Sequence, residues 1–89
     1  MVTALTMLAL AVEVTSPSTR DRDFGDKLRT YAGVGVAVYV IVDRKDRVVV
    51  VHHEPDPEKR AYAAVVTVPF GTPAPLPKPF SDLDTSSLR

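Results

Sequence analysis

The sequence predicts an α/β fold in which a βαβ unit and a following hairpin build a mixed β-sheet. Three consecutive patterns support this: an apolar run with a period of two that ends at Thr15, a helical pattern at residues 21–32, and a β-branched run at residues 36–43. Crossovers between parallel strands of one sheet are right-handed, and a βαβ unit of this kind places the strands around Val12 and Ile41 parallel to each other.

The first strand is expected to be buried and to present two different faces. Val12 and Val14 lie on one face, and Ala11, Glu13 and Thr15 lie on the other. The apolar stretch before Glu13 has no positively charged segment and no cleavage pattern, and it is too short to span a bilayer. The sequence therefore predicts neither a targeting segment nor contact with a membrane.

A turn-forming SPST segment precedes the predicted helix, and Ser18 or Thr19 is expected to cap that helix with its side chain. Apolar residues then recur four and three positions apart along a single helix from about residue 21 to residue 32. These residues are Phe24, Leu28 and Tyr31. We expect this stripe to pack on the sheet, and the glycines at 33 and 35 to end the helix.

The remaining strands follow from the pattern after the helix. Residues 36–43 are expected to form a central strand that is buried on both faces. After a polar turn, residues 47–53 should form its hairpin partner, residues 54–60 a surface loop, and residues 60–68 a further strand.

The segment after Pro69 is rich in proline and is expected to run extended over the surface. Its Phe70, Leu76 and Phe80 can dock on the sheet, and we favour this role over binding in the groove of an SH3-like partner. Residues 81–89 are expected to add a short turn of helix.

Length and composition predict one small domain at residues 1–89, with a core at residues 8–68 and the extended tail at residues 69–89. The basic and acidic residues balance, so no charge pattern marks a dedicated nucleic-acid or membrane-surface binder. The absence of cysteine excludes disulfides, zinc ribbons and thiol nucleophiles. We therefore expect a cytoplasmic protein.

Two candidate sites stand out among the polar residues. The adjacent His52 and His53 point to opposite faces of a strand, so they are not expected to share a metal ion, and a solvent-facing strand end explains them better.

The second candidate is Glu13, which lies within an apolar run. An ionised carboxylate there needs a nearby cation or hydrogen-bond donor to offset the cost of burial. Lys27 on the flank of the helix is the nearest candidate, with Arg20 as the competitor. The pair could be a structural salt bridge or a metal-binding acid beside a catalytic lysine.

The stretch from Val12 to Asp43 resembles the core signature of the Uma-two family of restriction-endonuclease-like proteins. That signature reads E-V-x-S-P-S-T on a strand, D-x-G-x-K-L-x-x-Y on a helix and G-V-x-x-Y-W-[IV]-V-D on the next strand. The residues that match it are Glu13, Val14, Ser16, Pro17, Ser18, Thr19, Asp23, Gly25, Lys27, Leu28, Tyr31, Gly35, Val36, Tyr39, Val42 and Asp43.

The resemblance implies a restriction-endonuclease-like fold of the PD-(D/E)xK superfamily and a bacterial Mg²⁺-dependent nuclease that hydrolyses DNA. Glu13 would be the metal-binding acid, and Lys27 the catalytic lysine displaced onto the helix. Ser16 would lie close to the usual place of that lysine. Together with Ser16, three further residues of the signature would support the site: Ser18, Asp23 and Tyr31.

The chain also departs from the family pattern upstream of Glu13. Leu8 and Ala9 replace a Pro-Asp element that carries the first metal-binding acid, and no acidic residue precedes Glu13. We therefore expect a C-terminal fragment or degenerate member that binds metal weakly and cleaves slowly or not at all. The alternative is a catalytically inactive binding or assembly module. An uncovered sheet edge or face would favour a homodimer.

Overall fold

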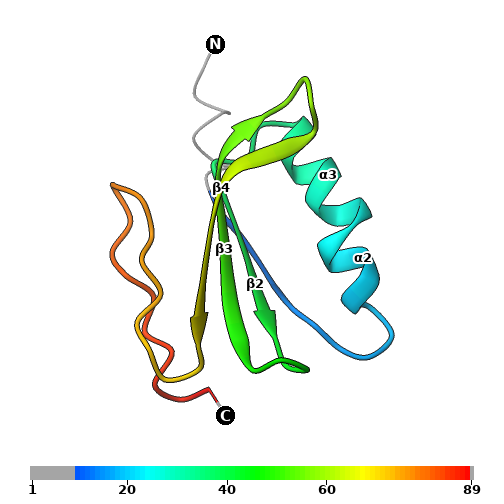
Figure 1. The fold of residues 1–89 in the computed structure, drawn as a ribbon. Helices are drawn as coiled ribbons and strands as arrows, with labels where there is room; N and C mark the ends of the chain where they lie inside the picture. The colour runs from blue at the N-terminus through cyan, green and yellow to red at the C-terminus, as the bar shows by residue number, and fades with distance from the viewer. Residues whose placement is uncertain (1–9, 89) are drawn as a thin grey trace.

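A computed structural model describes residues 10–88 of the chain, and in this part a four-stranded sheet is flanked by helices on one face (Figure 1). The elements are β1 (Leu10–Val14), α2 (Arg20–Phe24), α3 (Asp26–Gly33), β2 (Val38–Asp43), β3 (Val48–Asp56) and β4 (Ala61–Pro69). The strand order is β1-β2-β3-β4, with β1 parallel to β2 and the other neighbours antiparallel. The mixed α/β sheet, its βαβ unit and its hairpin are thus confirmed.

β2 lies in the middle of the domain, and all six of its residues are buried, as predicted for the central strand. Its Tyr39 and Ile41 face α2 and α3, where Phe24, Leu28 and Tyr31 pack against them. The valines at positions 38 and 40 face the opposite side, under the C-terminal tail. The two cores are therefore separated by the sheet itself.

The prediction that the first strand is buried is wrong. β1 is an edge strand, and Leu10, Val12 and Val14 on one of its faces are 40%, 51% and 58% exposed. The tail packs over residues of β2, β3 and β4 and leaves this face of β1 open. Leu8 and Ala9 lie outside the described residues.

The predicted single helix is interrupted at Gly25, which separates α2 from α3. A Cβ atom at this position would lie 2.8 Å from the carbonyl oxygen of Asp21, so the close approach of the backbone requires glycine. The predicted side-chain cap is also wrong: Thr19 is the N-cap residue but makes no capping hydrogen bond. Its hydroxyl instead accepts from the Ser16 amide and donates to Asp23 Oδ2.

The predicted surface loop at residues 54–60 is shorter than expected. β3 continues through Glu54 to Asp56, pairing Pro55 with Tyr62 and Asp56 with Ala61, so the turn occupies only residues 57–60. Glu54 has a φ of 58°, a left-handed value that residue patterns did not indicate.

His52 corrects the expectation of a solvent-facing strand end. Only 5% of this residue is exposed, because it lies on the helix-facing side of the sheet beside Tyr39 and Tyr62. Its Nδ1 donates to the Tyr39 carbonyl oxygen at 2.9 Å, and burial lowers the pKa of its imidazole. His53, on the opposite face, is the more exposed of the two.

The tail crosses the face of the sheet opposite the helices (Figure 1). Phe70, Leu76 and Phe80 pack against the valine cluster of β2 and β3, which confirms the predicted docking. The predicted helical turn near the C-terminus is absent from residues 81–88, where a bridge between Ala74 and Leu83 organises the tail instead. Within residues 10–88, no helix has the length and apolar character needed to cross a membrane.

Candidate active site

Two carboxylates converge on one ammonium group between the sheet and the helices. Lys27 Nζ on α3 lies 3.4 Å from Glu13 Oε1 on β1 and 3.1 Å from Asp23 Oδ1 on α2. Glu13 reaches this place because residues 11, 13 and 15 of the first strand face the helices. The predicted ion pair between Glu13 and Lys27 is present, and the alternative partner Arg20 instead binds Asp43.

Asp23 is the most deeply buried member of this group, with 1% of its side chain exposed. Its Oδ2 accepts a hydrogen bond from the Thr19 hydroxyl at 3.2 Å. Its Oδ1 accepts no hydrogen bond from any residue in the described part of the chain, so the ammonium of Lys27 is its electrostatic partner. The i,i+4 spacing of Asp23 and Lys27 could have revealed this pair from the sequence.

The two carboxylates set the charge state of the lysine. The Asp23 carboxylate has the largest effect and raises the pKa of Lys27 above its usual value; burial opposes this, and Glu13 raises the pKa further. The amine is therefore protonated at neutral pH and cannot act there as a general base. What it can supply is a fixed positive charge.

Two tyrosines hold the group in place. The Tyr31 hydroxyl donates to Glu13 Oε2 at 3.1 Å, and burial together with this carboxylate raises the pKa of Tyr31, so the phenol stays a neutral donor. The Tyr39 hydroxyl donates to the backbone oxygen of Asp23 at 2.9 Å from beneath α2. Tyr31 thus orients one carboxylate and Tyr39 anchors the helix that carries the other.

The serines expected to support the site lie beside it. Ser16 Oγ is 3.2 Å from Ser18 Oγ and 3.0 Å from Thr19 Oγ1, and Thr19 donates to Asp23. The two serines are therefore connected to the carboxylates through Thr19, a residue that the sequence analysis did not place in the site. Partial exposure of Glu13, at 27% of its side chain, opens this group to solvent.

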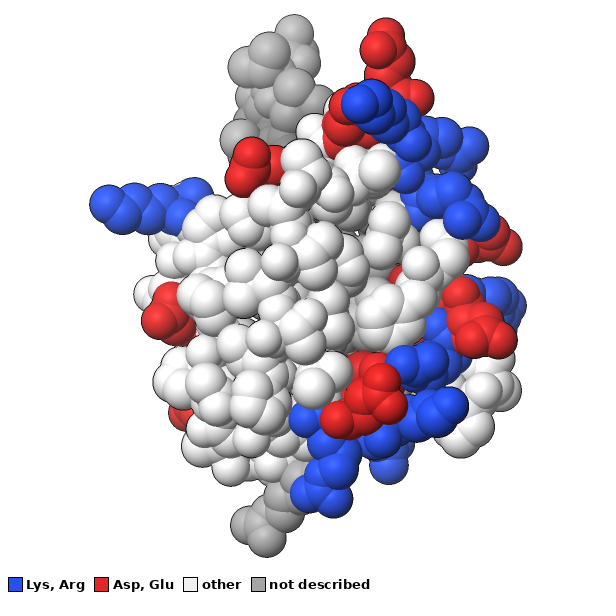
Figure 2. All heavy atoms as spheres, viewed as in Figure 1, with Lys and Arg blue, Asp and Glu red and all other residues white. Residues whose placement is uncertain are grey.

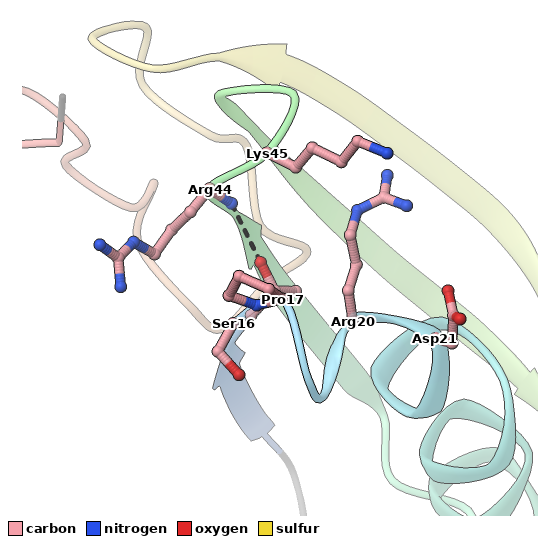
Figure 3. A pocket seen from close by; sticks show the side chains of 7 residues that line it. Ser16, Pro17, Arg20, Asp21, Arg44 and Lys45 are labelled. Carbon is pink, nitrogen blue, oxygen red and sulfur yellow. Dashed lines mark hydrogen bonds between the residues drawn. The ribbon is translucent and has the colours of Figure 1, made fainter.

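A cavity of about 660 Å³ lies at the carboxyl end of β1, next to these side chains (Figure 3). It is lined by Thr15, Ser16, Pro17, Arg20, Asp21, Arg44 and Lys45. Arg20 is held in a bidentate pair by Asp43, at 3.0 and 2.9 Å, and also contacts Asp46 at 3.2 Å. The Arg20 guanidinium lowers the pKa of the buried Asp43 carboxyl.

Comparison with protein families identifies the relationship that the site residues indicate. The family model described as "putative restriction endonuclease" matches residues 5–87. The chain belongs to the Uma2 family. This is the Uma-two family whose signature Glu13 and Lys27 carry, so the match covers the whole βαβ unit, the hairpin and most of the tail. A search among curated proteins gives no match.

In this Uma2 member, the acidic groups that meet at the site are two carboxylates. Residues 10–88 contain no group of three or more histidine, aspartate or glutamate side chains arranged to hold a metal ion. Glu13 and Asp23 are the two carboxylates that share one cation.

Proposed function

We propose that this Uma2 member is a metal-dependent endonuclease that hydrolyses DNA phosphodiester bonds, acting in the cytoplasm. The observation that carries the proposal is the convergence of Glu13 and Asp23 on the protonated Lys27, within a chain of a nuclease family. Glu13 and Lys27 are the proposed catalytic residues. Asp23, Tyr31, Ser16 and, further out, Ser18 support them.

The two carboxylates suit Mg²⁺ chemically. Mg²⁺ binds hard oxygen ligands and usually takes one or two carboxylates, completing its shell with waters and substrate phosphates. Asp23 Oδ1 is a buried oxygen without a hydrogen bond among the described residues, and Glu13 Oε1 contacts the same ammonium. Glu13 and Asp23 would therefore hold the ion. Bound there, Mg²⁺ would polarise the phosphodiester and lower the pKa of a coordinated water.

The chain's own groups act on charge and orientation. Negative charge builds on the phosphoryl oxygens as water attacks phosphorus, and the fixed charge of Lys27 stabilises it without needing to reorganise. Tyr31 donates a hydrogen bond to Glu13 Oε2 and so keeps Glu13 Oε1 turned toward the Lys27 ammonium. Thr19 does the same for Asp23.

The test is nicking of supercoiled plasmid by the purified chain in Mg²⁺ or Mn²⁺. We expect slow nicking that Glu13→Gln and Asp23→Asn both abolish. Asp26→Asn is the matched control, since Asp26 is exposed and pairs only with Arg29 among the described residues. Thermal unfolding followed by circular dichroism checks that each variant is folded. Nicking by folded Glu13→Gln at the wild-type rate would refute the proposal, as would equal nicking in EDTA.

A second function, that of a catalytically inactive assembly module, is favoured by the open face of β1. Leu10, Val12 and Val14 form an exposed apolar row on an edge strand. A second copy that packs on this face would cover the row, and pairing of the β1 edges would extend the sheet, giving a homodimer. Light scattering after gel filtration would then show a dimer that Val12→Lys converts to a monomer. Plasmid nicking would be absent in every variant.

A further inference from the structure

The cavity at the carboxyl end of β1 is a basic pocket beside the proposed catalytic group. Three of its lining residues are cationic, Arg20, Arg44 and Lys45, and one, Asp21, is acidic. Figure 2 shows that Lys and Arg side chains gather on the side of the molecule that carries the helices and at the lower end of the sheet, intermixed with acidic groups. The opposite surface in that view is mostly uncharged.

We propose that this pocket binds the DNA backbone at the phosphates next to the scissile one, with Lys45 contacting one phosphate over the pocket and Arg44 contacting another on the far side of the turn. The proposal rests on the proposed function, in that it takes DNA as the substrate. It adds two residues that neither the family signature nor the acid–lysine group contains.

The position of the pocket supports this assignment. Thr15, which lines it, directly follows β1 and is two residues after Glu13, so in extended chain the two lie about 6.6 Å apart. This separation is of the order of the distance between neighbouring phosphates in one strand. A phosphodiester at Glu13 therefore brings an adjacent phosphate to the pocket.

Some charged side chains of the pocket are already paired within the protein, and others are free to bind a phosphate. Arg20 is committed to Asp43 and Asp46, which neutralise it. Arg44 and Lys45 are exposed, and within residues 10–88 neither side chain forms an ion pair. They are therefore the cations that can pair with a phosphate, against the opposing charge of Asp21.

The backbone that carries these two cations is fixed. The Thr15 hydroxyl accepts a hydrogen bond from the Arg44 amide at 3.0 Å (Figure 3) and donates one to the Val42 carbonyl oxygen at 3.3 Å. The Lys45 amide donates to Asp43 Oδ1 at 3.1 Å. In Figure 3 the Lys45 side chain extends over the pocket toward Arg20, while the Arg44 side chain points to the other side. Arg44 and Lys45 thus lie on opposite sides of a turn whose backbone is held by these hydrogen bonds. A DNA strand can therefore run along the turn and contact both cations.

The test is binding of a fluorescently labelled DNA duplex in EDTA, measured by anisotropy over a range of salt concentrations. Wild type is compared with Arg44→Gln/Lys45→Gln. The matched control is Lys59→Gln/Arg60→Gln, which removes an adjacent pair of exposed basic residues from the turn between β3 and β4, at the other end of the sheet. We expect the pocket variant to raise the Kd by about tenfold or more, and to lower the slope of log Kd against log salt concentration by about 2. The control should change neither quantity by as much.

Equal effects of the two double variants on Kd and on the salt slope would overturn the proposal. Absence of DNA binding by wild type would also overturn it, as would calorimetric binding of inorganic phosphate by a chain that does not bind the duplex. Failure of the proposed nuclease is distinguished by measuring plasmid nicking in Mg²⁺ for the same three proteins, wild type and the two double variants. Selective loss of binding in the pocket variant, without nicking by any form, would support the pocket and reject the nuclease.

Discussion

The buried His52 is expected to make the stability of this protein depend on pH. His52 packs between Tyr39 and Tyr62, with ring centroids 5.6 and 5.8 Å away, and its Nδ1 donates to a backbone carbonyl. Burial lowers its pKa in the folded protein. The perturbation is His52→Phe, which keeps an aromatic ring in this position and removes the titrating group.

The sign and size of the effect follow from proton linkage. The unfolded chain takes up a proton at His52 as pH falls through about 6.5, whereas the folded chain stays neutral until its lower pKa is reached. Stability is therefore complete above about pH 6.5 and falls below it by up to about 1.4 kcal/mol per pH unit. At about pH 5 the loss reaches at most about 2 kcal/mol, which for a domain of this size lowers Tm by roughly 8–16 °C.

The assay is urea unfolding followed by circular dichroism at several pH values between about 5 and about 8. Wild type is compared with His52→Phe and with His53→Phe, the same change on the opposite face of β3. We expect the slope of unfolding free energy against pH to decrease in His52→Phe and to persist in His53→Phe. A wild-type slope retained in His52→Phe would refute the reasoning, as would its selective loss in His53→Phe.

Two further changes test the hydrogen bonds that hold the site and the tail. Tyr31→Phe removes the donor to Glu13 and should slow any plasmid nicking by at most about tenfold, which single-turnover rates would measure; complete loss would mean that Tyr31 does more than orient the carboxylate. Thr85→Val leaves the Gly71 amide and the Thr72 carbonyl without their buried hydroxyl partner and should cost about 1–3 kcal/mol in urea unfolding. An unchanged midpoint would show that this tail contact contributes nothing.

Period and composition predicted the elements that depend on neighbours along the chain. Residue patterns along the chain indicated how three segments pack. These are the apolar run of β2, the helical stripe of Phe24, Leu28 and Tyr31, and the proline-rich tail. The ion pair between Glu13 and Lys27 was also predictable, because an acid on the helix-facing side of β1 needs a cation within reach.

The errors arose where backbone geometry or distant contacts decide. Gly25 breaks the helix because Asp21 approaches it closely, and residue spacing does not report that distance. His52 is buried because it lies on the helix-facing side of β3 beside Tyr39 and Tyr62, although the neighbouring residues in the sequence are typical of a strand end. The exposure of Val12 depends on where the tail ends its path across the sheet.

The sequence by itself determined the family, the α/β class, the parallel strand pair and the acid–lysine pair, since these depend on residue types at fixed spacings. The i,i+4 spacing already brings Asp23 near Lys27, but only the tertiary structure decided that Asp23 is buried there beside Glu13, and that Arg44 and Lys45 line a separate pocket. The physical reason is that a shared cation and a pocket are made by side chains from β1, α2, α3 and a distant turn. Their distances are set by how the helices pack on the sheet.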